Sequence, residues 1–310
     1  MEKEFTYDYE TNCNPIPPGE KDLPTQTAEY FVKVTDVIPT HLEGVCFDRT
    51  GDNMYFCSTD IGRVFKLDMK TKELKIIWED EGLRSFGIKM HKDGRIFACC
   101  FGTKRKPGVY VLSPEGEELE VLLEGQEIDD LIFDRDGGFY ASKFIGNVYD
   151  PAGGVYYVSP DFKTVTPYAE NLAAPNGVAL SKDEKILWIT EYCGGRLLRT
   201  PVGGGWGSVP YHFTGFHGPD SCEIDDDDNL YVACTFQGRI MVFNRDGFPI
   251  GQILTPKREE GRNLISTHAT LRPGTDEVYI SCSDDTTDEG SWIFKAKGFA
   301  KAYEGAFQFL

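Results

Sequence analysis

Six related segments repeat along this chain of 310 residues, and their spacing constrains the fold more than any other feature. Each segment begins with a short hydrophobic stretch, crosses a polar turn and enters a second hydrophobic stretch, as in PDSCEI followed by DDNLYVA. The equivalent positions that open the segments are Glu43, Phe86, Asp129, Asn176, Asp220 and Thr267, which are 43, 43, 47, 44 and 47 residues apart. A period of this length, with several strands in each repeat, is typical of propeller blades. The spacing therefore predicts an all-β fold, a six-bladed β-propeller.

The pattern inside a repeat predicts the composition of a blade. In the fifth repeat, four short hydrophobic stretches are separated by polar turns, and we read them as strands at Ser221–Ile224, Leu230–Thr235, Arg239–Asn244 and Pro249–Leu254. Turn residues such as Gln237-Gly238 suit hairpins between such strands. No window of the sequence keeps a helical period, so little helix is expected. Each blade is therefore predicted to be a four-stranded antiparallel sheet.

The two ends of the chain are expected to close the ring. Residues 1–25 contain several prolines and are interpreted as an irregular N-terminal lead, and residues 26–310 as a single propeller domain. Residues 26–40 are rich in strand formers and are predicted to pair with the blade that contains Gly298–Leu310. Closure by N- and C-terminal strands would remove the exposed sheet edge that an open array leaves.

The composition narrows the classes of partner and location. The net charge of −18 argues against binding of nucleic acid or of anionic membranes. The N-terminus has no apolar core of a secretory signal, and no stretch is apolar enough for a transmembrane helix. Most of the nine cysteines fall inside predicted strands without CxxC spacing, as expected for small hydrophobic residues in a reducing cytoplasm. The oligomeric state is left open.

Four of the six repeat positions carry oxygen ligands. In a propeller the equivalent positions of all blades converge around one axis, so Glu43, Asp129, Asn176 and Asp220 should meet. Three carboxylates enclosed together repel one another and lose hydration, and a divalent cation would remove that penalty. Mixed carboxylate and amide oxygens suit Ca²⁺, with Mg²⁺ as the lesser alternative, whereas zinc would require His or Cys. Ser221 follows Asp220 and is expected to add a hydroxyl or carbonyl oxygen.

At these residues the sequence resembles a known enzyme family. The segments that carry the likeness are GGVYYVSPDFKTVTPYAENLAAPNGVALSKDEKILWITE, GPDSCEIDDDDNLYVA, GRIMVFNRDGFPIGQIL, STHATLRPGT and GFAKAYEGAFQF. They are similar to the calcium-dependent lactonases of the gluconolactonase and senescence-marker-protein family, and most similar to the bacterial drug-responsive lactonases. The resemblance implies a catalytic Ca²⁺ held by the four repeat residues with Ser221, and a proton-transfer role for Asp220. The second, structural calcium of the drug-responsive lactonases is not expected, because the equivalent loop is here the short EGQE at residues 124–127.

The function predicted from this likeness is hydrolysis of a small lactone to its hydroxy acid. The cation would polarise the carbonyl, and Asp220 would take a proton from the attacking water. His217 and His268 are candidates for substrate binding or proton relay, with a purely structural role equally open for each. Phe86 and Phe144 are candidate substrate contacts and, with Tyr192, would suit an aromatic or acyl lactone. Several polar groups there would suit a sugar lactone instead, and the mixture leaves the substrate open. Two alternatives remain: another esterase or phosphotriesterase on the same site, or a non-catalytic binding propeller.

Overall fold

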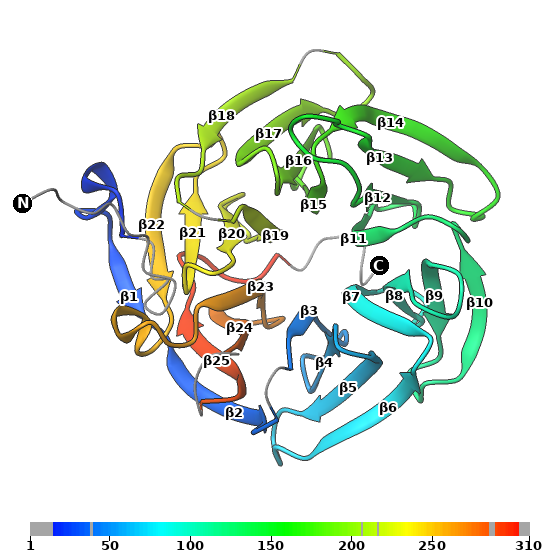
Figure 1. The fold of residues 1–310 in the computed structure, drawn as a ribbon, viewed down its shortest axis with the longest axis horizontal. Helices are drawn as coiled ribbons and strands as arrows, with labels where there is room; N and C mark the ends of the chain where they lie inside the picture. Colours follow the sequence, from blue (N-terminus) through cyan, green and yellow to red (C-terminus); the bar gives the residue numbers. More distant parts are fainter. Residues whose placement is uncertain (1–14, 38–39, 206, 216, 285–288, 304–310) are drawn as a thin grey trace, which may run out of the picture.

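Six sheets stand around one central axis, each with its first strand innermost (Figure 1). The computed structural model describes residues 15–37, 40–205, 207–215, 217–284 and 289–303. The innermost strands contact one another in the cyclic order β3, β7, β11, β15, β19, β23 and back to β3. The predicted all-β, six-bladed propeller is confirmed.

In the first five blades, the four strands follow one another along the chain and pair with their neighbours. The first blade comprises β3 (Leu42–Phe47), β4 (Asn53–Ser58), β5 (Gly62–Asp68) and β6 (Leu74–Asp80). The second comprises β7 (Leu83–Met90), β8 (Ile96–Gly102), β9 (Gly108–Leu112) and β10 (Glu118–Leu122). The third comprises β11 (Ile128–Phe133), β12 (Phe139–Lys143), β13 (Gly153–Val158) and β14 (Val165–Leu172). The pairing within these three sheets is antiparallel throughout.

The remaining three blades repeat this arrangement. The fourth comprises β15 (Pro175–Leu180), β16 (Ile186–Glu191), β17 (Arg196–Pro201) and β18 (Ser208–His212). The fifth comprises β19 (Pro219–Ile224), β20 (Leu230–Cys234), β21 (Arg239–Phe243) and β22 (Pro249–Leu254), and the sixth begins with β23 (Ile265–Leu271), β24 (Glu277–Ser283) and β25 (Ser291–Lys297). The described residues contain only two short 3₁₀ helices, η1 (Pro18–Glu20) and η2 (Arg258–Glu260), as the lack of helical periodicity predicted.

The sixth blade takes its outermost strand from the start of the chain. Strand β2 (Glu29–Thr35) pairs antiparallel with β25, so the N-terminal segment closes the ring as predicted. The C-terminal partner was placed too late in the sequence, because the closing strand ends at Lys297. The chain then turns back, and Ala302 bridges to Asp225 of the fifth blade. Residues 304–310 lie outside the described residues.

A second N-terminal strand, β1 (Thr25–Thr27), pairs in parallel with β22 of the fifth blade. Its approach is fixed by Arg239, which is almost fully buried and donates to a Glu20 oxygen at 2.6 Å and to Gln252 at 2.7 Å. The N-terminal segment therefore attaches to two neighbouring blades. The proposed domain boundary near residue 26 stays a prediction, since residues 1–14 are not described.

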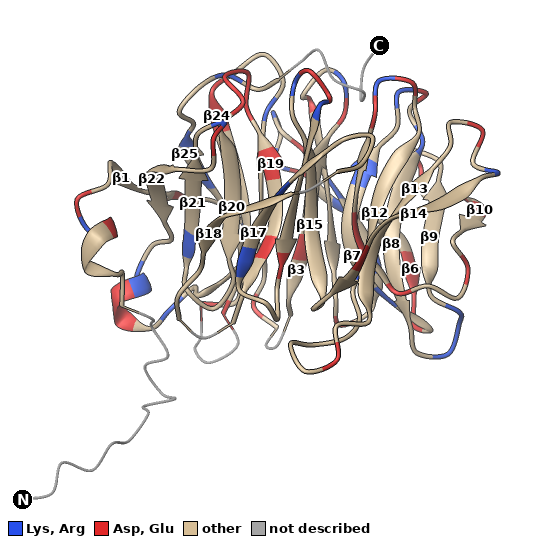
Figure 2. Cartoon of the chain, turned by 90° about the horizontal axis from the view of Figure 1, so that it is seen from above, with Lys and Arg blue, Asp and Glu red and all other residues tan. Residues whose placement is uncertain are grey.

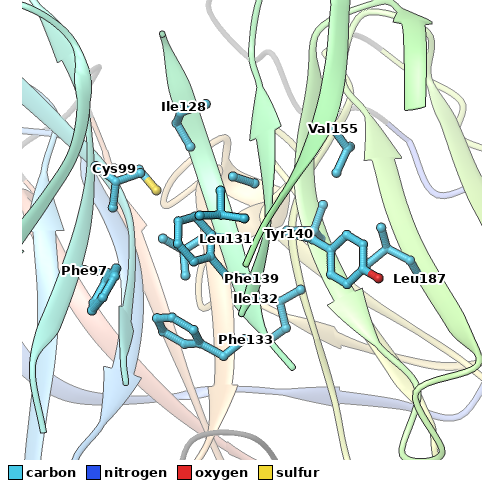
Figure 3. Packing of buried hydrophobic residues seen from close by; sticks show 14 of the residues in the cluster. Phe97, Cys99, Ile128, Leu131, Ile132, Phe133, Phe139, Tyr140, Val155 and Leu187 are labelled. Atoms are coloured by element: carbon cyan, nitrogen blue, oxygen red, sulfur yellow. The ribbon is translucent and has the colours of Figure 1, made fainter. Parts of the chain in front are cut away.

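The hydrophobic core lies between neighbouring blades rather than at the axis. Phe97 of β8 meets Phe133 of β11 edge to face, with ring centroids 4.9 Å apart, and Phe133 in turn meets Phe139 at 5.7 Å (Figure 3). Edge-to-face aromatic pairs of this kind add to the free energy of burial. Because apolar contacts between sheets fix the blades, the inner strand ends are free to carry polar side chains.

Charged residues are frequent in the loops at both faces of the ring (Figure 2). No helix among the described residues is long and apolar enough to cross a membrane. The eight cysteines of the described residues are all free thiols, and all but Cys193 are buried. This agrees with the interpretation of the strand cysteines as small hydrophobic residues.

Candidate active site

Every innermost strand breaks its pairing register at the repeat position identified in the sequence. The register shifts lie between Glu43 and Val45, Ser85 and Ile88, Ile128 and Leu131, Pro175 and Val178, Pro219 and Cys222, and Ser266 and His268. A β-bulge bends the strand and changes the direction of the side chains beside it, and bulges are frequent next to active sites. The six repeat positions therefore share one local backbone irregularity as well as one phase.

Glycine follows the repeat position in three blades, because the inner strands approach each other closely there. A Cβ atom on Gly177 would lie 2.6 Å from the backbone nitrogen of Cys222 in the next blade. A Cβ on Gly87 would lie 2.5 Å from the carbonyl oxygen of Asp129. Both distances are too short for any side chain, so glycine permits backbone-to-backbone contact between blades at the level of the repeat residues.

Three carboxylates share the enclosure that these strands form. Glu43, Asp129 and Asp220 are all buried. Burial, and then the charges of Asp220 and Asp129, raise the pKa of Glu43 well above its ordinary value. Burial followed by the charges of Asp220 and Asp130 does the same to the pKa of Asp129, and burial raises the pKa of Asp220 to about 8. In the described part of the chain, none of the three forms an ion pair with a lysine or arginine.

The neighbouring neutral groups fit a hard cation. Asn176 hydrogen-bonds to the Asp220 carboxylate through its side chain, while its Oδ1 atom is buried and has no hydrogen-bond partner among the described residues. The hydroxyl oxygen of Ser221 is likewise buried without a partner in that part of the chain. Buried oxygens without donors are costly, and a Ca²⁺ ion would satisfy them. No three His, Cys, Asp or Glu side chains among the described residues are already grouped closely enough to hold an ion, so a cation would have to draw the carboxylates inward.

Aromatic side chains from four blades form a continuous series beside the carboxylates. We call this series the aromatic arc; its members are Phe86, Phe101, Phe144, Tyr192, His217 and Phe236. Successive ring centroids are 4.1, 6.0, 5.7, 6.2 and 4.0 Å apart. The two predicted phenylalanines thus belong to one larger apolar surface, which no single repeat position reveals.

Within the aromatic arc, the Tyr192 hydroxyl lies 2.9 Å from Nδ1 of His217. Burial lowers the pKa of His217, so the imidazole is neutral at pH 7. The pKa of Tyr192 is raised by burial and then by the charges of Asp220 and nearby groups that include Glu43, so its phenol lies within electrostatic reach of the carboxylates. His217 also has a φ of 65° and stacks on Phe236, so its orientation is held by the surrounding residues.

The other predicted histidine lies elsewhere. His268 of β23 is completely buried, and neither ring nitrogen has a hydrogen-bond partner within the described ranges. Burial and the charge of Lys89 lower its pKa well below the ordinary value. The structure therefore places His217 in the aromatic arc. His268 lies outside the arc, within electrostatic reach of Lys89.

Comparison with known proteins identifies the family of the chain. Residues 121–262 match the family model described as SMP-30/Gluconolactonase/LRE-like region. The chain is 44% identical to a protein named Lactonase drp35 from Staphylococcus saprophyticus, over 97% of this chain and 96% of the relative. The chain belongs to the SMP-30/gluconolactonase family. The protein of the same name from Staphylococcus aureus strain MRSA252 is 43% identical over 94% of this chain and 93% of its own length.

Solved structures of the same fold lie at lower sequence identity. Regucalcin from Agrobacterium tumefaciens, described as a calcium-binding protein, aligns with a TM-score of 0.72 and 15% identity over 91% of this chain and 99% of its own. A gluconolactonase from Xanthomonas campestris aligns with a TM-score of 0.64 and 16% identity over 91% and 98%. At these identities the likeness shows that the six-bladed fold is shared.

Two hydroxyls that the sequence interpretation missed hold the repeat residues of this SMP-30/gluconolactonase member in place. Thr190 of β16 accepts from the Gly177 nitrogen at 2.7 Å and donates to the Asp220 carbonyl oxygen at 2.6 Å. Ser142 of β12 accepts from the Asp130 nitrogen at 3.1 Å and donates to the carbonyl oxygen of Asn176. Each hydroxyl links the backbone beside one repeat position to the repeat residue of the next blade. Both residues are the last of the second hydrophobic stretch of their repeats, in FYAS and LWIT. This shared position is the sequence signal that could have identified them.

Proposed function

We propose that the chain hydrolyses a small lactone to the corresponding hydroxy acid, with Ca²⁺ held by Glu43, Asp129, Asn176 and Asp220 beside Ser221. The observation that carries this proposal is the enclosure of three mutually repelling carboxylates with two unpartnered buried oxygens. A pure scaffold has no physical reason to keep such a set, because burying unpaired charge is destabilising. The names of the curated relatives support lactone hydrolysis, which is a carboxylic ester hydrolysis.

Different residues of the chain have different proposed roles in the reaction. When bound, the cation would supply a Lewis acid that polarises the ester carbonyl. Asp220 is the proposed proton acceptor for the attacking water and would pass the proton to the ring oxygen as the ring opens. Burial raises the pKa of Asp220 to about 8 without a cation, so a bound cation would be needed to keep it ionised as an acceptor. Tyr192, oriented by His217, is the proposed hydrogen-bond donor to a substrate oxygen, since its phenol lies within electrostatic reach of the carboxylates. Phe86 and Phe144 of the aromatic arc would receive the apolar side of the lactone.

The test is to measure the hydrolysis of a panel of lactones by pH-stat titration. Wild-type protein would be assayed after chelation and after return of Ca²⁺ or Mg²⁺, together with Asp220→Asn and with Asp136→Asn, a matched change in an exposed turn. We expect activity that is lost on chelation, returns best with Ca²⁺, falls at least about a thousandfold in Asp220→Asn and is unchanged in Asp136→Asn.

The same assay separates the alternatives. Cleavage of aryl esters or phosphotriesters in preference to every lactone would replace the lactonase proposal with another hydrolase at this site. A folded protein that binds no divalent cation and cleaves nothing would leave a non-catalytic binding propeller. We also propose a reducing cytoplasm as the location, supported by the free thiols, and no nucleic-acid or membrane partner, supported by the net charge of −18.

A further inference from the structure

A buried ion pair crosses the channel below the carboxylates. Lys89 of β7 donates to a Glu223 oxygen of β19 at 2.6 Å; the Lys89 side chain is fully buried and that of Glu223 nearly so. Each residue lies three positions after a repeat position, Lys89 after Phe86 and Glu223 after Asp220. The pair therefore lies one layer deeper in the channel than the proposed cation.

The two residues come from opposite sides of the ring. They belong to the second and fifth blades, which are three steps apart in the cyclic order of inner strands. A direct hydrogen bond between diametrically opposed strands has to pass through the channel axis. The pair thus forms the floor of the enclosure whose upper layer holds Glu43, Asp129 and Asp220.

The ammonium also faces other groups of the site. The positive charge of Lys89 acts to lower the pKa values of Asp130, His268 and Cys46 of the first blade. Asp130 in turn contributes to the repulsion within the carboxylate layer. The lysine is therefore electrostatically connected to the layer above it. Charges in a buried channel are weakly screened by solvent and salt, so the connection acts over the whole enclosure.

We propose that Glu223 and Lys89 form a charge-neutral strut across the channel floor, and that Glu223 is a positioning residue for the cation above because it keeps the Lys89 ammonium from opposing that cation. This inference rests on the proposed cation site. Without Glu223, Asp130 would be the remaining acidic neighbour of the Lys89 ammonium. The ammonium would then leave an unbalanced positive charge one layer below the site and would repel a divalent ion bound there.

The experiment is calorimetric titration of chelator-treated protein with CaCl₂ at pH 8, using wild type, Glu223→Gln and the double variant Lys89→Met/Glu223→Gln. Glu223→Gln should bind Ca²⁺ at least about tenfold more weakly. The double variant should return to within about threefold of wild type, since its channel floor is neutral again. The exposed pair of Lys182 and Asp226, 2.7 Å apart, provides matched controls, and Asp226→Asn should leave Ca²⁺ affinity unchanged.

Rescue by a second substitution separates this role from a structural one. If the pair only supports the fold, the double variant would bind Ca²⁺ as weakly as Glu223→Gln or more weakly, and that result would overturn the proposal. Unchanged affinity in Glu223→Gln would overturn it as well. Should Glu223→Gln fail to fold, the double variant still decides: thermal unfolding in chelator shows whether it folds, and wild-type-like Ca²⁺ affinity is required of it. A wild-type protein that binds no Ca²⁺ would refute the proposed function itself, and the inference with it.

Discussion

The two polar layers of the channel differ in how their charge is balanced. In the lower layer, the Lys89 ammonium meets the Glu223 carboxylate at 2.6 Å, so the chain supplies both signs. In the upper layer, Glu43, Asp129 and Asp220 raise one another's pKa values or share the influence of Asp130, and none has a lysine or arginine partner in the described residues. The comparison teaches that the chain itself neutralises the buried charge of the lower layer and leaves that of the upper layer unbalanced. Under the proposed function, a cation from solution would neutralise only the upper layer.

The largest expected effect comes from removing one upper carboxylate with the isosteric change Glu43→Gln. Affinity for Ca²⁺ and the rate of lactone hydrolysis should each fall by about a hundredfold to a thousandfold, since one charged ligand is lost. The same change should stabilise the chelated protein by about 1–3 kcal/mol, because repulsion within the layer is relieved. Calorimetric titration and chemical denaturation in chelator measure the two quantities. A variant that loses both Ca²⁺ binding and stability would contradict the comparison.

Removing the positive charge of Lys89 from the lower layer should lower the stability of the folded protein. Lys89→Met leaves Glu223 buried without a partner and is expected to lower the free energy of unfolding by about 3–5 kcal/mol. Lys182→Met breaks a surface pair whose lysine side chain is 37% exposed, and should cost at most about 1 kcal/mol. Urea denaturation of the two variants makes the comparison. Equal losses would mean that the buried pair contributes no more than a surface pair.

The pH dependence of stability should reveal the unbalanced layer directly. The folded-state pKa of Asp220 is raised to about 8, so the native state holds a proton that the unfolded chain has released by pH 6. Stability in chelator should therefore fall as the pH rises toward 8, by about 2–3 kcal/mol from pH 6 to pH 8 for one such group, or roughly 4 °C in Tm. Saturating Ca²⁺ should abolish the fall. Thermal scans at several pH values that are flat in chelator would show that burial does not raise the pKa of Asp220.

The smallest effect is expected in the aromatic arc. Tyr192→Phe removes the hydroxyl that meets His217 but keeps the ring, and should lower kcat about tenfold with little change in Ca²⁺ affinity. Tyr149→Phe is the matched control, because Tyr149 is 98% exposed in the loop after Phe144. Steady-state kinetics on one lactone is sufficient. A change confined to KM would instead make Tyr192 a binding contact.

Much of the fold followed from the repeat, because strand alternation and hairpin chemistry are local properties of sequence. Glu43, Asp129, Asn176 and Asp220 could be selected as one set since a propeller converts sequence phase into spatial proximity. The bulges could not be predicted in this way, because a register shift depends on the partner strand. The parallel pairing of β1 also escaped, since its partner β22 lies more than 200 residues further along the chain.

The lower layer has a sequence signal that the interpretation of the repeats did not use. Lys89 and Glu223 stand at the same offset from their repeat positions, in IKM and CEI, and each alone resembles an outward-facing strand residue. Only the cyclic order of the blades places them opposite one another. The link between Tyr192 and His217 had no comparable signal, because both lie in turns whose course depends on the packing of neighbouring blades.

The N-terminal strand of the sixth blade also determines when the ring can close during protein synthesis. Strand β2 ends at Thr35, but its partner β25 begins at Ser291, so the ring cannot close until the ribosome has made the strands of all six blades. At ordinary rates of synthesis the wait is roughly 13 to 50 s. Throughout that time β2 is a β-prone edge without its partner. A newly made chain therefore carries an edge open to aggregation until β25 has been translated.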